Sequence, residues 1–336
     1  MSQLRQDPTT KEWVIIAPRR AARPHDPLRV EREPLPARDP ACPFCPGNEE
    51  RTPPEIMRVP NGSGWRIRVV PNLFPAVAPT GRPRRAGDGV FGRMDGVGAH
   101  EVIVESPRHD ARIDEMAEGE VEDVLEVWRQ RYDALEREPW ARSVVLFKNF
   151  GATAGTSLVH THSQVVAIPV HAPEDLRRHS VALRYFDDTG RSVYDDLRDA
   201  EVRERERVVA EVGSMVSFAP FASRAPYETW ILPARHRSSF ARVDDDELAD
   251  LARLLREVLR ALRAAAGDPD FNIVVASGPA ADRDQPHFTW HLRVLPRLAT
   301  AAGFELGSGM SINPVAPEDA AARMRESLDR AGAAAR

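Results

Sequence analysis

Apolar and polar positions along the first half of the chain predict short strands followed by a helix. The segments 13–16 and 66–70 are short and largely apolar, and 100–105 alternates between two faces, as strands do. A helix is predicted next, because apolar residues then recur every three or four positions, at Val121, Val124, Trp128, Tyr132 and Leu135. This order predicts strands that precede a single amphipathic helix.

Two more strands follow the predicted helix. The apolar segment 143–147 leads into a loop that contains Gly151 and Gly155, and the next strand carries the stretch VHTHSQVVAIP at residues 159–169. This last strand is unusual, since polar side chains occupy alternate positions in a segment that otherwise has the composition of a protein core.

The same order of elements recurs 127 residues later, without a gap over about seventy residues. Glu101 corresponds to Glu228, His109 to His236 and His160 to His287. The apolar face of the helix corresponds to Leu248, Leu251, Leu255, Leu259 and Leu262. A constant offset across strand, helix, glycine and histidine positions favours an internal duplication over chance similarity.

Two copies of this unit predict an α+β fold in which antiparallel sheets carry helices packed on one face. We expect two related domains, at residues 1–175 and 176–336, with helical linkage around 170–210. The copies differ in chemistry, because Thr289 stands in the second copy where the first has His162.

Composition excludes several classes of protein. The 336 residues carry a formal net charge of -5, whereas nucleic-acid binders carry a basic surplus. There is no apolar run long enough to span a bilayer, and the polar start does not resemble a secretory signal. We therefore expect a cytoplasmic protein that binds neither nucleic acid nor membrane.

Both cysteines lie in one short segment, Cys42-Pro-Phe-Cys45. A stable disulfide is not expected in a reducing compartment. The C-x-x-C spacing alone is compatible with half of a metal site, a redox pair or no special role.

Residues two apart in a strand project from the same face, about 6.6–7 Å apart. His160, His162 and Gln164 are thus predicted to share one face, directly after a loop of small residues. A neutral imidazole can bond to phosphorus, an uncharged amide can donate to phosphoryl oxygens, and Ser157 with loop N–H groups can contact a phosphate. Each residue alone has a structural explanation, since a histidine in a strand is more often hydrogen-bonded than catalytic; together they indicate nucleotidyl transfer.

These residues resemble the histidine-triad superfamily and, within it, the galactose-1-phosphate uridylyltransferase family. The motif His160-Thr-His162-Ser-Gln164 is similar to the family's H-P-H-x-Q, with Thr161 in place of proline. Four further segments resemble segments of the family and occur in the family's order along the chain. They are Pro18-Arg-Arg20-Ala-Ala-Arg23-Pro, the C-x-x-C loop, Val70-Pro-Asn72-Leu-Phe74-Pro, and the segment 100–109 that ends in His109.

The resemblance implies a ping-pong transferase of galactose or related carbohydrate metabolism. His162 is expected to attack the α-phosphorus of a sugar nucleotide, and Gln164 to stabilise the nucleotidyl-histidine; the acceptor is a hexose 1-phosphate or phosphate. Residues expected to contact phosphates, ribose or base are Ser157, Asn149, Gly151, Arg20, Arg23, Asn72 and Phe74.

The resemblance also implies a metal. Cys42, Cys45, His109 and His160 would form a closed, structural Cys2His2 zinc site. Some members have a second metal in the C-terminal half; here Thr289 replaces one histidine of that pair and leaves His291, so no second metal is expected. Phe304 and Glu305 resemble a segment that reaches the sugar in the neighbouring subunit, which implies a homodimer.

The nucleotide is the least determined part of the function. We favour a UDP-glucose–hexose-1-phosphate uridylyltransferase, with an ADP-glucose phosphorylase as a close second. A hydrolase and a nucleotide-binding module that has lost its activity are the remaining alternatives.

Overall fold

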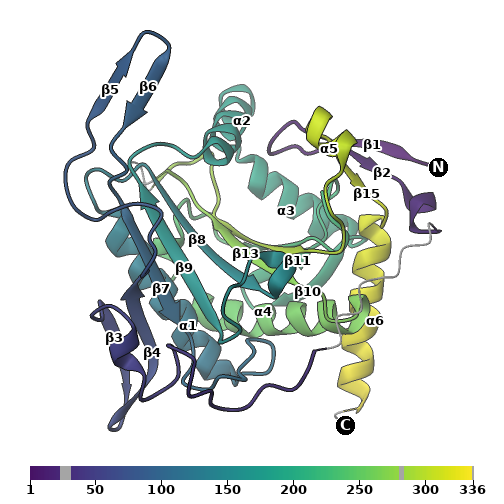
Figure 1. Ribbon diagram of the computed structural model, residues 1–336. Helices are drawn as coiled ribbons and strands as arrows, with labels where there is room; N and C mark the ends of the chain where they lie inside the picture. The colour runs from purple at the N-terminus through teal and green to yellow at the C-terminus, as the bar shows by residue number, and fades with distance from the viewer. Residues whose placement is uncertain (23–31, 280–283, 335–336) are drawn as a thin grey trace.

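In a computed structural model, residues 1–22, 32–279 and 284–334 are described. A ten-stranded antiparallel sheet dominates the fold (Figure 1). In spatial order its strands are β10 (Val208–Val212), β11 (Met215–Phe218), β12 (Thr229–Pro233), β14 (His291–Pro296), β13 (Phe271–Ala276), β8 (Ser143–Phe150), β9 (His162–Ile168), β7 (Ala99–Val104), β4 (Gly64–Pro71) and β3 (Met57–Asn61).

The strands of the two halves are arranged symmetrically about the centre of the sheet. Reading outward from β8 gives β9, β7, β4 and β3, and reading outward from β13 gives β14, β12, β11 and β10. At the centre Phe147 pairs with Val274, its counterpart at the offset of 127. The two copies are therefore related by an approximate two-fold axis through the β8–β13 pair.

Helices α1 (Glu118–Glu136), α4 (Asp245–Ala266) and α6 (Pro317–Ala334) cover one face of this sheet (Figure 1). The α4 helix begins at a capping box between Asp244 and Glu247 and ends at Gly267, whose φ of 76° suits a glycine. Its leucine face packs with α1 in one hydrophobic core that runs through both halves.

Helices α2 (Pro173–Thr189) and α3 (Val193–Glu204) lie on the opposite face, over the C-terminal half. The expected helical linkage is confirmed for these two helices. It is wrong for Val208 and Val209, because the β-branched pair starts β10 and pairs with β11.

Smaller elements surround the sheet. The strands β1 (Gln3–Gln6), β2 (Trp13–Ile16) and β15 (Ser311–Asn313) form a small sheet beside α5 (Gly303–Ser308), and β5 (Arg85–Asp88) with β6 (Phe91–Met94) forms a projecting hairpin (Figure 1). Short 3-10 helices are η1 (Pro18–Ala22), η2 (Glu49–Arg51), η3 (Ala152–Ala154) and η4 (Phe240–Arg242).

The predicted α+β class with antiparallel sheets and packed helices is confirmed. The division into two domains at residues 175 and 176 stays a prediction; both residues lie inside α2. Among the helices of the described residues, none has the length and apolar character needed to cross a membrane.

Because the helices of both halves share one core, we expect the chain to unfold as one unit. Leu125→Ala in α1 removes a fully buried side chain and should lower the free energy of unfolding by about 2–5 kcal/mol. Hydrogen exchange should show amides of β13 losing protection together with those of β8. Undiminished protection of β13 would mean that the two halves unfold separately.

Candidate active site and metal centre

The polar side chains of strand β9 divide between its two faces. Ser163 points toward the helices, where Trp128 Nε1 donates to its Oγ at 2.7 Å. The alternate residues His162 and Gln164 therefore project from the other face, as predicted. The prediction that His160 shares this strand face is wrong, because His160 lies before the first residue of β9 and its ring contacts Cys42 and Cys45 instead.

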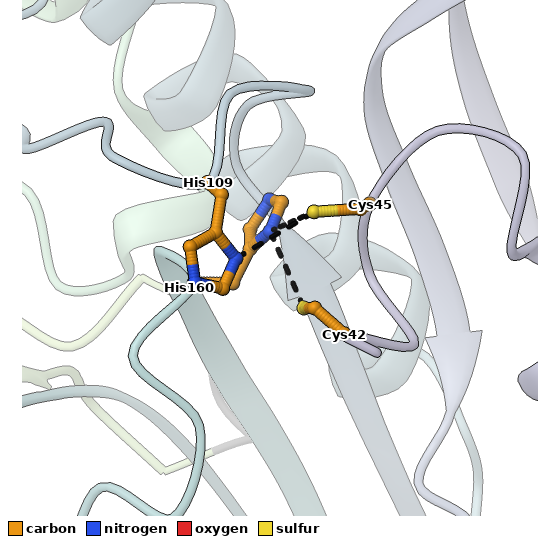
Figure 2. A group of neighbouring side chains, drawn as sticks. All are labelled: Cys42, Cys45, His109 and His160. Carbon is orange, nitrogen blue, oxygen red and sulfur yellow. Dashed lines mark hydrogen bonds between the residues drawn. The ribbon is translucent and has the colours of Figure 1, made fainter. Parts of the chain in front are cut away.

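The side chains of Cys42, Cys45, His109 and His160 converge in one buried cluster (Figure 2). His160 Nδ1 lies 3.6 Å from each cysteine Sγ, and His109 Nδ1 lies 3.5 Å from Cys45 Sγ. All four potential ligand atoms lie within 4.8 Å of one another, an arrangement that could hold a metal ion. The structure thus brings together the four residues proposed from the sequence.

Hydrogen bonding prepares His160 for this role. Its Nε2 lies 2.7 Å from the Ser106 carbonyl oxygen and donates to it, so Nδ1 keeps its lone pair for a metal. Burial lowers the pKa of His160 to about 4 and raises the pKa of the Cys42 thiol to about 11. A bound cation would favour the cysteine thiolates and offset this cost of burial.

His162 is held differently, although it is only two residues away. Its Nδ1 lies 2.8 Å from the His160 carbonyl oxygen and donates to it. Nε2 then carries the lone pair and has no hydrogen-bond partner among the described residues. Burial also lowers the pKa of His162, which favours the neutral, nucleophilic imidazole.

Thr161, at the position of the family's proline, is tied to a buried ion pair. Its hydroxyl lies 2.6 Å from Glu105 Oε2 and 2.8 Å from Lys148 Nζ, and Lys148 also donates to the His162 carbonyl oxygen at 3.2 Å. Thr161 points away from the His162 side chain, as expected. The ion pair holds the backbone between the two histidines, a role that sequence reasoning did not find.

A second residue missed in the sequence is His100, which orients Gln164. The Ala76 N–H donates to His100 Nδ1, so His100 Nε2 is the donor to Gln164 Oε1 at 2.8 Å. Asn72 Nδ2 lies 3.0 Å from His100 Nε2 and donates to the same Gln164 oxygen at 3.4 Å. With its oxygen engaged, Gln164 presents its NH₂ group as a donor. The alternating pattern of 100–105 was the available signal, but only strand pairing brings His100 to Gln164.

The loop after β8 adds further polar groups. Asn149, the next-to-last residue of β8, lies on the same face as Phe147, which pairs with Gln164. Gly151 has a φ of 88°, a conformation that favours glycine, and Ser157 is exposed.

Of the remaining predicted residues, one lies beside Asn72 and others lie elsewhere. Phe74 is exposed next to Asn72, whose Oδ1 accepts from the Phe74 N–H at 2.9 Å. Phe304 and Glu305 belong to α5, which lies on the side of the molecule away from β9 (Figure 1). Arg20 belongs to η1, which follows the small sheet, where the Ala17 N–H donates to the Asn313 carbonyl oxygen. Arg23 lies outside the described residues.

Comparison with known proteins identifies the family. Residues 1–171 match the family described as galactose-1-phosphate uridyl transferase, N-terminal domain. The chain belongs to the galactose-1-phosphate uridylyltransferase family of nucleotidyltransferases. Residues 114–336 also match a family described as a domain of unknown function (DUF4921).

Two relatives illustrate the range of the family. The chain is 35% identical to an ADP-glucose phosphorylase of Arabidopsis thaliana over 96% of this chain and 92% of that protein. It is 28% identical to a galactose-1-phosphate uridylyltransferase of Thermotoga maritima over 97% of this chain and 98% of that one.

Solved structures of the family agree with this fold. A crystal structure of an Arabidopsis thaliana ADP-glucose phosphorylase with bound ADP-glucose superposes with a TM-score of 0.84 at 34% identity, covering 97% of this chain and 98% of that one. A uridylyltransferase structure superposes with a TM-score of 0.78 at 27% identity, covering 98% and 99%.

The C-terminal half keeps the family's sheet but covers the corresponding face. His291, the counterpart of Gln164, is fully buried, with its ring 4.9 Å from Tyr194 of α3 and 4.8 Å from Trp230. Thr289, the counterpart of His162, is also fully buried, and its hydroxyl donates to Asp195 Oδ1 at 3.0 Å and lies 3.0 Å from His236 Nδ1. Helices α2 and α3 thus occupy the face that the N-terminal half leaves for His162.

We predict that Cys42→Ser loses bound metal and lowers the melting temperature, because a serine hydroxyl is a poor replacement for a thiolate ligand. His162→Ala is the matched control: it removes a nearby histidine that is outside the cluster and should keep the metal. Elemental analysis and thermal denaturation measure both effects. Undiminished metal in Cys42→Ser would remove Cys42 from the ligand set.

Proposed function

We propose that this chain transfers a nucleoside monophosphate from a sugar nucleotide to a phosphate acceptor through a covalent intermediate on His162. The observation that carries the proposal is the anchoring of His162 Nδ1 to the His160 carbonyl oxygen at 2.8 Å, which leaves Nε2 as the nucleophile. Gln164 lies two residues along the same face and offers amide donors.

In the first step Nε2 of His162 attacks the α-phosphorus. A nitrogen–phosphorus bond forms, the bond from phosphorus to the bridging oxygen breaks, and sugar 1-phosphate leaves with that oxygen. The ring becomes cationic, and its Nδ1–H donates to the His160 carbonyl, which stabilises the positive charge. The NH₂ groups of Gln164 and Asn149 and the Ser157 hydroxyl are proposed donors to the phosphoryl oxygens.

In the second step an oxygen of the acceptor phosphate attacks the same phosphorus. The nitrogen–phosphorus bond breaks, and the electron pair returns to Nε2. Asn72 and Phe74 are proposed to contact the ribose and base. Phe74 is well placed for this, because its exposed ring is available for stacking.

The sequence alone favoured a uridylyltransferase, and we now propose adenylyl transfer from ADP-glucose to inorganic phosphate as the first candidate. Support comes from the comparisons above, in which identity and TM-score are higher for the ADP-glucose phosphorylase than for the uridylyltransferases. Uridylyl transfer from UDP-glucose to a hexose 1-phosphate is the second candidate, supported by the family match over residues 1–171.

The metal proposed for the cysteine–histidine cluster is Zn²⁺. Tetrahedral zinc with its usual bonds to sulfur and nitrogen requires S···N separations of about 3.6 Å. The separations of 3.5 and 3.6 Å agree with this value. Such a closed site would be structural and would join the N-terminal loop to the segment that carries His162.

We also propose a homodimer with shared sites. The helix α5, which contains Phe304 and Glu305, and the small sheet next to Arg20 lie away from β9 of their own chain (Figure 1). We propose that these residues act at the His162 site of a second copy. The sequence resemblance assigns Phe304 and Glu305 to the sugar, and arginine suits phosphate.

The chemistry predicts that protein incubated with sugar nucleotide labelled at the α-phosphate retains acid-labile, base-stable label. His162→Ala should retain none, whereas His171→Ala, an exposed histidine outside the site, should label like wild type. ADP-glucose should label more protein than UDP-glucose, and inorganic phosphate should discharge the label as nucleoside diphosphate.

Label that survives in His162→Ala would contradict the proposed nucleophile. Discharge by hexose 1-phosphate alone would favour the uridylyltransferase, and release of free nucleoside monophosphate without an acceptor would favour a hydrolase.

A shared site predicts complementation between two inactive variants. His162→Ala and Glu305→Ala homodimers should each transfer slowly. After mixing and exchange of subunits, about a quarter of sites should contain both intact residues and regain activity. A mixture no more active than its components would show that the sites are not shared.

A further inference from the structure

The C-terminal half lacks a nucleophile, yet two of its side chains hold the proposed phosphate-binding segment of the N-terminal half. Strand β13 pairs with β8 so that Asn272 lies opposite Asn149 and Phe271 opposite Phe150. The loop 151–157 therefore starts beside the first residues of β13. Asn272 and Asp270 are both buried at this junction.

The orientation of the Asn272 amide is determined by an arginine. Arg297 Nε, which can only donate, lies 2.6 Å from Asn272 Oδ1. The amide nitrogen of Asn272 must then face the other way, where it donates to Asn149 Oδ1 at 2.7 Å and to the Ala154 carbonyl oxygen at 2.9 Å.

The orientation of the Asn272 amide in turn determines the orientation of the Asn149 amide. Because Asn149 Oδ1 accepts from Asn272, its NH₂ group must point to the opposite side, and it has no acceptor among the described residues. A side chain built on Gly155 would come 3.7 Å from this nitrogen, so the NH₂ group faces the glycine-bearing loop. An Asn149 with the reverse orientation would present an oxygen there and repel a phosphate.

Asp270 fixes the loop itself. Its Oδ2 accepts from the Thr153 N–H at 2.7 Å and from the Thr153 hydroxyl at 2.6 Å, while Arg32 Nη2 lies 2.6 Å from Oδ1. The carboxylate occupies the space that a Cβ on Gly151 would need. The path of the loop thus depends on a side chain from the other half.

We propose that Asn272, oriented by Arg297, is a positioning residue that turns the Asn149 NH₂ group toward the transferred phosphoryl group, and that Asp270 holds the adjoining loop in the matching shape. This inference rests on the proposed function, in which Asn149 donates to phosphate. It gives the duplicated half a role in the reaction.

The test is a double-mutant cycle between Asn272 and Asn149, with nucleotidyl transfer measured as kcat and KM. Asn272→Asp keeps the size of the side chain and still accepts from Arg297, but it cannot donate to Asn149, whose amide should turn around. We expect transfer to fall about 100-fold, as when a donor to a developing charge is lost. Metal content should stay at the wild-type level, and the melting temperature should fall by a few degrees, because the hydrogen bond to the Ala154 carbonyl oxygen is lost as well.

In an Asn149→Ala background, Asn272→Asp should cause no further loss, because the residue through which it acts is gone. Asn61→Asp, which changes an exposed asparagine in β3, controls for the added charge.

Arg297→Ala tests the same orientation by a second variant. Arg297 is exposed, so its truncation should leave the fold intact while the Asn272 amide loses the donor that orients it. Arg297→Ala should slow transfer by a smaller factor than Asn272→Asp does. Arg297→Lys, which keeps a donor, should recover part of the lost rate.

The outcomes separate this inference from the proposed function. If Asn149→Ala is slow but Asn272→Asp is harmless, or if the two losses multiply, the positioning role is wrong while His162 chemistry stands. If Asn149→Ala transfers normally, the role of Asn149 and this inference both fail. If His162→Ala still retains the α-phosphate label, the proposed function fails, and this inference fails with it.

Discussion

The pairing of β8 with β13 is the contact on which the rest of this structure depends. It joins the two copies into one sheet about an approximate two-fold axis, and it lets helices from both halves share one core. It also places Asn272 opposite Asn149. One set of strand contacts therefore serves both the stability of the fold and the geometry of the proposed phosphate site.

The two copies differ mainly in what covers the face opposite the shared helices. In the N-terminal half this face meets the cysteine-bearing loop, in which Cys42 and Phe44 pack near Val102 and Val104. In the C-terminal half α2 and α3 bury it around Trp230. A nucleophile beneath these helices would not reach a substrate. This gives a physical reason why the second copy has Thr289, and not a histidine, at the position of His162.

Two histidines in one motif perform different tasks because their backbone contacts differ. His160 donates from Nε2 to Ser106 and offers Nδ1 to the cysteines, whereas His162 donates from Nδ1 and offers Nε2. The carbonyl oxygen of His160 is the acceptor that orients His162. A metal that fixes His160 would thus also fix the orientation of the proposed nucleophile.

The sequence by itself indicated the repeat, the α+β class and the helices α1 and α4, because hydrophobic periodicity is a local property. The four residues of the metal cluster followed from the resemblance to the family, because C-x-x-C spacing alone left several roles open. It did not reveal His100, Asn272 or the Lys148–Glu105 pair, since each acts on a residue distant in the chain. Nor did it show that Arg20 lies away from His162 of the same chain. Those relations were decided by the tertiary structure, because strand register and the partners of hydrogen bonds exist only once distant segments are brought together.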